Sequence, residues 1–280
     1  MKNRPIGIFD SGLGGLTVAR SIIDLLPDEH IIYLGDDARG PYGPREQGEV
    51  RAFAREIIDY LLGFGVKLVV IACNSATAAA LEEAQRDYDI PVVGVILPGL
   101  RAALQRSTRR RIGVIGTRLT ISSGTYERAL GRLDPSADIV CQACPEFVEL
   151  VENGEVKGTR AREITEGYIE PLAAEGIDTL ILGCTHYPLL QELIQEVVGS
   201  GVTLISSADE TAREVGDILE RLGWKREAGS PGLHYFLTTG NVEKSARLGR
   251  MFLGPEVRDV IHVGFDLHPP LDFPDGGGKG

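Results

Sequence analysis

The sequence predicts an α/β protein with two doubly wound domains whose sheets are rich in parallel strands. Apolar, β-branched segments alternate with longer amphipathic segments along most of the 280 residues, and this alternation is typical of strands joined by helices. Several apolar segments are almost continuous in Val, Ile and Leu, as expected for strands buried on both faces of a parallel sheet. Nine such segments are more than one small sheet usually holds, so we expect two sheets.

The expected elements follow one another along the chain. Strands are predicted over Pro5–Phe9, His30–Leu34, Lys67–Ala72, Pro91–Val95, Arg111–Ile115, Asp138–Ala143, Asp178–Gly183, Val202–Ile205 and His234–Leu237. Helices are predicted over Arg45–Leu62, Ala76–Asp87, Thr159–Ala174 and Ala208–Leu222, with a shorter helical run over Pro145–Val151. The 35 glycines suit the tight turns between such elements.

The second domain is expected to be an insertion in the first. We place the first domain at residues 1–97 and 207–265 and the second at residues 98–206. The chain would cross between them at a break formed by Leu97-Pro98-Gly99 and again at Ser206-Ser207. Residues 268–280 contain three prolines and four glycines, so residues 266–280 are predicted to be a flexible tail.

The composition is that of an ordinary folded chain with an acidic balance. Asp and Glu number 40 against 29 Lys and Arg, for a formal net charge of −11, and 43% of residues are hydrophobic. An acidic chain repels phosphate, and the one dense basic run, Arg109–Arg111, is too short to form a groove, so a nucleic-acid partner is disfavoured. No apolar run approaches the ~20 residues that cross a membrane. Asp10 interrupts the N-terminus before a signal-peptide core could form, so we expect a cytoplasmic protein without a membrane partner.

Two of the four cysteines follow apolar strands at matching places. Cys73 ends one expected strand and is followed by Asn74 and Ser75, and Cys184 ends another and is followed by Thr185 and His186. Each would lie where the carboxyl end of a strand meets the start of a helix, which is where open α/β folds bind ligands. The sequence therefore predicts a site built around two thiols.

Two thiols in matching positions indicate proton transfer. A thiol at a helix N-terminus is more acidic than a free one, because the helix dipole and free amides stabilise the thiolate. One such thiol would suggest a nucleophile, whereas a pair suggests groups on opposite faces of one carbon, one removing a proton and the other delivering one. The alternative is that each cysteine only packs in the core, as buried cysteines commonly do.

Three further side chains are candidates, each with a structural alternative. His186 could hold or relay a proton beside Cys184, although a lone histidine is more often structural. Asp10 opens Asp10-Ser11-Gly12-Leu13-Gly14-Gly15, a turn that could receive an anion, but it could equally cap the next helix. Glu152 follows a helical run in the second domain, where an acid is by default solvated.

Other motifs are incomplete. Gly12-x-Gly14-x-x-Thr17 lacks the third glycine of a dinucleotide-binding loop, for which Asp36 would have been the ribose-binding acid, and no P-loop is present. Cys141-Gln-Ala-Cys144 is a lone C-x-x-C without the further ligands of a zinc site. No lysine stands in a motif that indicates a pyridoxal Schiff base. We therefore expect neither a metal nor a cofactor.

Together these residues resemble the cofactor-independent aspartate/glutamate racemase family, from Pro5 to about Gly240. The segments that carry the resemblance are Pro5–Thr17, Leu34–Arg45, Ala72–Ala78, Ile112–Thr117, Cys144-Pro145 leading to Glu152, and Leu182–Pro188. The resemblance implies two α/β domains with the active site in the cleft between them, and racemisation of L- and D-glutamate without cofactor or metal. In members of this family, D-glutamate supplies bacterial peptidoglycan.

The resemblance also implies a role for each site residue. Cys73 would exchange the α-proton of D-glutamate with help from Asp10, and Cys184 that of L-glutamate with help from Glu152 and His186. Substrate contacts are expected from Asp10, His186, Ser11, Asn74, Ser75 and Thr185 around the amino and α-carboxylate groups, and from Tyr42 and Gly43 at the side-chain carboxylate.

Some features depart from the family pattern or stay open. Asp37 and Ser75 stand where threonine is common, Glu149 stands where proline is common, and Ser206–Ala212 matches only partly. The rivals are a racemase of aspartate or another amino acid, a decarboxylase or isomerase that uses one thiol, and a catalytically silent binding or regulatory protein of the same fold. A homodimer fits the family, but oligomeric state and allosteric control by a cell-wall precursor leave no signature in the sequence.

Overall fold

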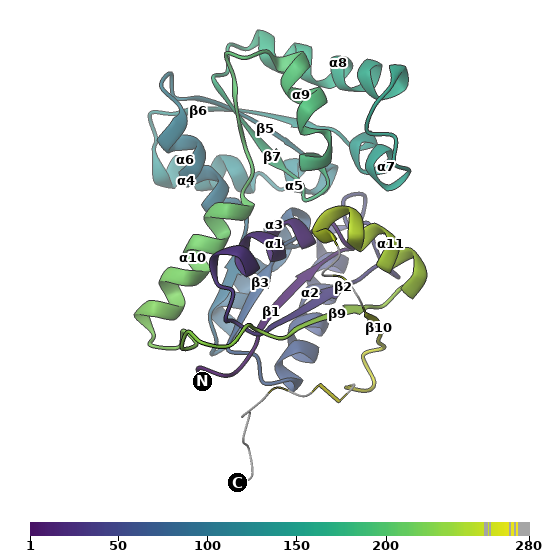
Figure 1. Ribbon diagram of the computed structural model, residues 1–280. Helices are drawn as coiled ribbons and strands as arrows, with labels where there is room; N and C mark the ends of the chain where they lie inside the picture. The colour runs from purple at the N-terminus through teal and green to yellow at the C-terminus, as the bar shows by residue number, and fades with distance from the viewer. Residues whose placement is uncertain (255–256, 258, 269, 272, 274–280) are drawn as a thin grey trace.

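The computed structural model describes residues 1–254, 257, 259–268, 270, 271 and 273, and contains two β-sheets in separate halves of the molecule (Figure 1). The first sheet has six strands in the order β10-β9-β2-β1-β3-β4, and the second has four in the order β6-β5-β7-β8. All of the strand pairs are parallel. The predicted α/β class with two parallel sheets is confirmed.

Each of the nine predicted strands is present, with ends that differ by at most two residues. The first sheet is built from β1 (Ile6–Asp10), β2 (Ile31–Gly35), β3 (Leu68–Ile71), β4 (Val92–Gly94), β9 (His234–Thr238) and β10 (Val260–His262). The second is built from β5 (Arg111–Gly116), β6 (Asp138–Ala143), β7 (Thr179–Gly183) and β8 (Thr203–Ile205). A tenth strand, β10, was not predicted from the sequence.

Helices cover both faces of each sheet, as buried parallel strands require. The first half contains α1 (Leu16–Leu25), α2 (Gln47–Gly63), α3 (Asn74–Asp87), α10 (Ala208–Arg221) and α11 (Val242–Leu253). The second half contains α4 (Ile96–Arg106), α5 (Arg118–Ser122), α6 (Thr125–Leu133), α7 (Glu146–Glu152), α8 (Thr159–Ala174), the 3₁₀ turn η1 (Tyr187–Leu190) and α9 (Gln191–Val198). Within the described residues, none of these helices has the length and apolar character to span a bilayer.

The alternation of side chains along β1 shows how the first core forms. Ile6 and Ile8 point to a cluster shared with α1 and α10, whereas Phe9 points to the opposite cluster shared with α2 and α3. All three side chains are fully buried. Because β1 is packed on both faces, its carboxyl end is held in place, and Asp10 at that end is held with it.

The chain crosses between the halves twice. It passes from β4 to β5 through α4, and returns between β8 and α10 (Figure 1). The crossing expected at Leu97-Pro98-Gly99 falls within this connection, but these residues form the first turn of α4 and not a break in regular structure. Proline is tolerated there, since the first-turn amides of a helix have no intrahelical partner. The domain boundaries at residues 97/98 and 206/207 remain a prediction.

Described residues near the C-terminus contact the first half. The His268 ring stacks on Tyr60 with ring centroids 4.4 Å apart, and the Phe273 ring lies 5.2 Å from that of His30. Residues 269, 272 and 274–280 lie outside the described residues, so the flexible tail over 266–280 stays a prediction.

Candidate active site

The candidate residues gather where the strand order of each sheet reverses. In the first sheet, β2 and β3 flank β1 on opposite sides, and in the second sheet β6 and β7 flank β5 in the same way. Crevices at such points, outside the carboxyl ends of the strands, are the usual ligand sites of open α/β sheets. Phe9 pairs with Ile71, and Gly116 pairs with Gly183. Each cysteine therefore follows a strand that borders one of these crevices.

Cys73 lies at the N-cap of α3 and is 5% exposed. Its Sγ lies 3.7 Å from Oγ of Ser11, which follows β1. Burial raises the pKa of the Cys73 thiol well above its usual range, and the nearby charge of Asp10 raises it further, although the amide of Ala76 opposes the shift. Cys73 is therefore a protonated thiol at neutral pH.

Cys184 follows β7 and has a different partner. It is 7% exposed, and its Sγ lies 3.9 Å from Nδ1 of His186. On the other side of the imidazole, Nε2 lies 3.6 Å from Oε1 of Glu152. The His186 ring therefore lies between the Cys184 sulfur and the Glu152 carboxylate and contacts both.

The charge on His186 follows from these two contacts. Burial alone would lower its pKa, but the Cys184 sulfur and the Glu152 carboxylate favour the protonated ring and, together with the charge of Asp10, raise the pKa to about 10. In turn, the contact with His186 lowers the pKa of Glu152. At neutral pH a positive imidazolium thus lies beside the Cys184 sulfur.

The two thiols belong to one site. A charge on Cys184 is close enough to raise the pKa of Cys73, and the charge of Asp10 reaches His186 in the other half. The loop after β1 also packs against the loop after β7, since a β-carbon on Gly14 would lie 2.5 Å from Oγ1 of Thr185. The structure therefore brings together the two strand ends that the sequence singled out.

Asp10 is fully buried and only partly satisfied. Its Oδ2 accepts a hydrogen bond from the amide of Gly15 at 3.0 Å, whereas its Oδ1 has no partner among the described residues. A buried carboxylate oxygen without a donor is costly. This oxygen is therefore available to a polar group that enters the site, and the capping role considered for Asp10 uses only the other oxygen.

Hydroxyl and amide groups join the halves beside the thiols. Ser75 Oγ lies 2.8 Å from Thr117 Oγ1 and 3.2 Å from Thr120 Oγ1, and Asn74 Nδ2 donates to the Tyr126 hydroxyl at 3.0 Å. The two α3 residues were predicted from the sequence, and their three partners in the second half were not. A signal for Thr117 was present, since it follows β5 directly, as the cysteines follow their strands.

Helix α11 adds two contacts that the sequence did not indicate. Lys244 Nζ lies 4.0 Å from Oε2 of Glu152, and the Phe252 ring meets the His186 ring edge-on at 6.0 Å between centroids. Figure 1 shows α11 in yellow-green beside the junction of the two halves. The last described helix of the first half thus reaches the residues behind Cys184.

Tyr42 and Gly43, both predicted to contact the substrate, lie in different surroundings. The Tyr42 side chain is fully buried and its hydroxyl donates to Asp36, so the side chain is already engaged within the protein. Gly43 lines a cavity, and a β-carbon there would lie 2.7 Å from that of Thr117. Only a residue without a side chain allows this approach of the two halves.

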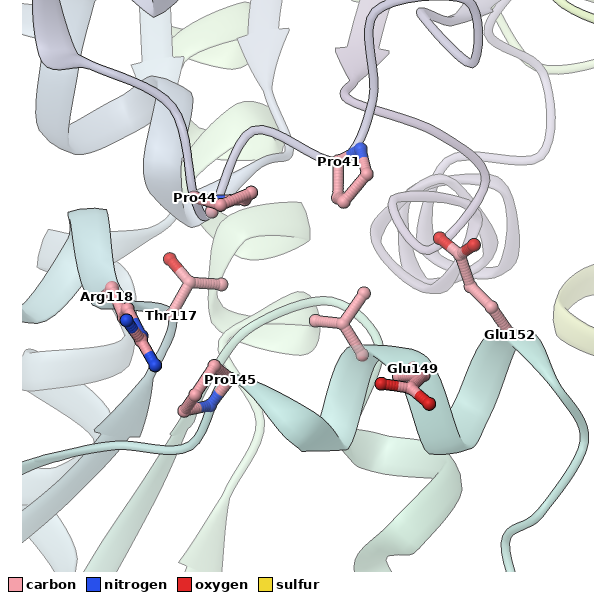
Figure 2. Close-up of a pocket in the computed structure, with 9 residues that line it drawn as sticks. Pro41, Pro44, Thr117, Arg118, Pro145, Glu149 and Glu152 are labelled. Atoms are coloured by element: carbon pink, nitrogen blue, oxygen red, sulfur yellow. The ribbon is translucent and has the colours of Figure 1, made fainter.

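The cavity of ≈ 480 Å³ lies between the loop after β2 and the second half (Figure 2). Pro41 and Pro44 face it from one side, and Thr117 and Glu152 from the other. The lining residues are Pro41, Gly43, Pro44, Thr117, Arg118, Pro145, Val148, Glu149 and Glu152. The cysteines do not line it. Through Thr117 and Glu152, the cavity adjoins the site that holds them.

The structure assigns other roles to the residues of the rival motifs. Asp36 is fully buried and accepts from Arg39 Nε at 2.7 Å and Thr239 Oγ1 at 2.8 Å, so it is a structural acid. Cys141 and Cys144 are unpaired thiols that belong to different hydrophobic clusters. In the part of the chain that the structure describes, no group of three or more His, Cys, Asp or Glu side chains is arranged to hold a metal ion.

The chain is similar to known proteins along most of its length. The Asp/Glu/Hydantoin racemase family profile matches residues 6–215. A glutamate racemase of Mycobacterium leprae is 52% identical over 257 residues, which cover 91% of this chain and 94% of that protein. Among solved structures, glutamate racemase RacE1 of Bacillus anthracis has a TM-score of 0.89 at 44% identity, covering 94% of this chain and 97% of the other.

A second solved structure carries a ligand. Glutamate racemase of Francisella tularensis, in complex with D-glutamate, has a TM-score of 0.89 at 32% identity and covers 95% of this chain and 99% of its own. The family match over residues 6–215 and these relatives all point to the same family. The two α/β halves with paired thiols at strand ends are consistent with it. The chain belongs to the Asp/Glu/Hydantoin racemase family and is an amino-acid racemase.

Proposed function

We propose that this protein interconverts L-glutamate and D-glutamate by a cofactor-independent transfer of the α-proton between two thiols. The observation that carries the proposal is the pair of buried cysteines at matching strand ends, each with its own polar partners. The relatives at about half identity support glutamate as the substrate, and the Francisella structure supports it with bound D-glutamate. Glutamate racemase of Escherichia coli, with a TM-score of 0.77, was solved with L-glutamate.

The charges around the two thiols favour one starting state for the reaction. His186 is protonated at neutral pH, and this cation would stabilise a thiolate formed at Cys184, while burial and Asp10 keep Cys73 as a thiol. This state suits L-glutamate: the Cys184 thiolate removes the α-proton and the electron pair stays on the substrate as a carbanion conjugated with the α-carboxylate. The Cys73 thiol then delivers its proton to the opposite face.

The proton count balances in both directions. After one turnover from L to D, Cys184 carries the proton and Cys73 is a thiolate. That is the state from which D-glutamate reacts in reverse. Asp10 would assist at Cys73, and Glu152 and His186 at Cys184. The net proton shift between the sulfurs is returned by solvent or by the reverse reaction.

The polar groups around the thiols would hold the substrate. Substrate contacts are proposed for Asp10, Ser11, Asn74, Ser75, Thr185 and His186 at the amino and α-carboxylate groups, and for Gly43 and the Tyr42 backbone at the side-chain carboxylate. The unpartnered Oδ1 of Asp10 suits a substrate donor such as the ammonium group. The amides at the start of α3 would stabilise the anionic groups.

The cellular role follows from the product. We propose that the D-glutamate enters bacterial peptidoglycan synthesis, that the protein acts in the cytoplasm, and that it forms a homodimer. Its partner at the site is a small molecule.

A racemisation assay tests the proposal. The purified chain, free of added cofactor, is given L-glutamate, and circular dichroism follows the optical signal. The signal should decay to zero with the wild type. It should do the same with the control Cys141→Ala, because Cys141 is a half-buried cysteine outside the site. It should decay ~10²–10⁴-fold more slowly with Cys73→Ala and Cys184→Ala. The assay is repeated with L-aspartate, and loss of the signal with aspartate but not with glutamate would mean that aspartate is the substrate. Binding of glutamate without loss of the signal would favour a silent binding protein.

A further inference from the structure

The Tyr126 hydroxyl lies beside one sequence neighbour of each thiol. Tyr126 lies on α6 in the second half, is 1% exposed, and accepts a hydrogen bond from Asn74 Nδ2 at 3.0 Å. Asn74 is the first residue of α3 and the direct neighbour of Cys73. The bond therefore joins the second half to the helix turn that carries the first thiol.

The same hydroxyl also lies against the end of β7. A β-carbon on Gly183 would be 3.2 Å from the Tyr126 hydroxyl, and Gly183 directly precedes Cys184. A charge on Cys184 is also close enough to raise the pKa of the phenol. A single side chain is thus in contact with the neighbours of both thiols, which come from different sheets.

The phenol is suited to hold a position and not to exchange protons. Burial raises its pKa well above the usual range, so the group is protonated at neutral pH. No hydrogen bond links it to either sulfur among the described residues. Its contribution is therefore geometric.

We propose that Tyr126 is a positioning residue, whose hydroxyl orients the Asn74 amide toward the substrate and fixes the start of α3 relative to the end of β7. This inference rests on the proposed function, because Asn74 is a proposed substrate contact. An amide free to rotate about its side chain would present the wrong group to the substrate for part of the time. Fixing it before binding lowers the cost of ordering the complex.

The test is a double-mutant cycle with Tyr126→Phe and Asn74→Ala. Tyr126→Phe keeps the buried ring and removes only the hydroxyl. Tyr168→Phe is the matched control, because the Tyr168 hydroxyl donates to Glu146 at 2.7 Å on the exposed surface of the same half. All variants are compared for kcat and KM with L-glutamate, for D-glutamate affinity by calorimetry, and for melting temperature.

Tyr126→Phe should weaken glutamate binding and kcat/KM about tenfold, mostly through KM, as expected for loss of one buried hydrogen bond at a binding group. On the Asn74→Ala background the same change should cost no more than about twofold, since the partner is already absent. Tyr168→Phe should match the wild type.

Two results would overturn the inference: Tyr126→Phe within about twofold of the wild type, or a loss that repeats in full on the Asn74→Ala background. The second result would mean that the hydroxyl acts by some route other than Asn74. Wild type that binds glutamate without turning it over would contradict the proposed function. In that case the D-glutamate affinities of the four proteins in the double-mutant cycle, measured by calorimetry, would still test the role of Tyr126. Wild type that neither binds nor turns over glutamate would contradict both.

Discussion

A β-carbon on Gly14 would lie 2.8 Å from Nδ1 of His186, so the loop after β1 is in contact with the histidine behind Cys184. Gly14→Ala should therefore push the two loops apart and disturb the pairing of His186 with its sulfur. Because small displacements of reacting groups are expensive, we expect kcat/KM to fall at least about tenfold. The melting temperature should change little, since the displacement is confined to the loops.

The control for Gly14 is another glycine with free space around it. A β-carbon on Gly48 in α2 would meet no atom within 4 Å. Gly48→Ala should keep full activity and stabilise the protein by ~0.5–1 kcal/mol, because alanine is the better helix former. Equal activity of the two variants would contradict the proposed contact between the loops.

The raised pKa of His186 predicts a pH-dependent contribution to stability. A folded-state pKa of about 10, above the ordinary 6.5, means that the folded chain binds this proton more tightly than the unfolded chain. The contribution is complete below pH 6.5 and is lost as the pH rises through about 10. The difference in free energy of unfolding between wild type and His186→Asn, from urea titrations, should therefore shrink between these values. A difference that stays constant across that range would show that the histidine is not held as a cation.

The buried pair of Lys67 and Glu29 predicts a large stability effect away from the site. Lys67 Nζ lies 2.5 Å from Glu29 Oε2 and both side chains are at most 2% exposed. Lys67→Ala would leave a buried carboxylate without its partner and should cost ~3–5 kcal/mol. Lys157→Ala breaks an exposed pair with Glu192 and should cost ~0–1 kcal/mol. Chemical denaturation of the two variants checks both values, and similar losses would count against this account.

Asp37, which departs from the family pattern, forms hydrogen bonds with residues of β9 and α11. Its Oδ2 accepts from Thr238 Oγ1 at 2.6 Å and from Ser245 Oγ at 3.0 Å, and its burial raises its pKa. Asp37→Ala should destabilise the protein by ~1–3 kcal/mol and leave kcat/KM within about threefold. A large loss of activity at unchanged stability, measured by turnover and thermal melting, would instead place Asp37 at the substrate.

The two thiols and the strands that carry them could be predicted because local pattern determines them. A buried parallel strand is a continuous apolar run, and a polar or thiol residue directly after it must lie at the edge where ligands bind. The same reasoning would have found Thr117 after β5.

Contacts that depend on how helices pack across the two halves could not be predicted. The contacts of Tyr126 and Phe252 arise from tertiary packing between the halves and leave no period or spacing in the sequence. Within the second half, the pairing of Glu152 with His186 was expected only from the family resemblance. The α4 turn at Leu97-Pro98-Gly99 was misinterpreted for a related reason, since proline and glycine end most helices but are accepted in a first turn.

The central claim is that the two thiols act on opposite faces of one carbon, and hydrogen exchange in D₂O tests it most directly. Cys73→Ala and Cys184→Ala are each incubated with L-glutamate and with D-glutamate, and NMR follows the α-proton. We predict that Cys73→Ala exchanges only L-glutamate and Cys184→Ala only D-glutamate, each without inversion. Racemisation at near wild-type rate in either variant, or equal exchange of both enantiomers, would contradict the two-thiol mechanism.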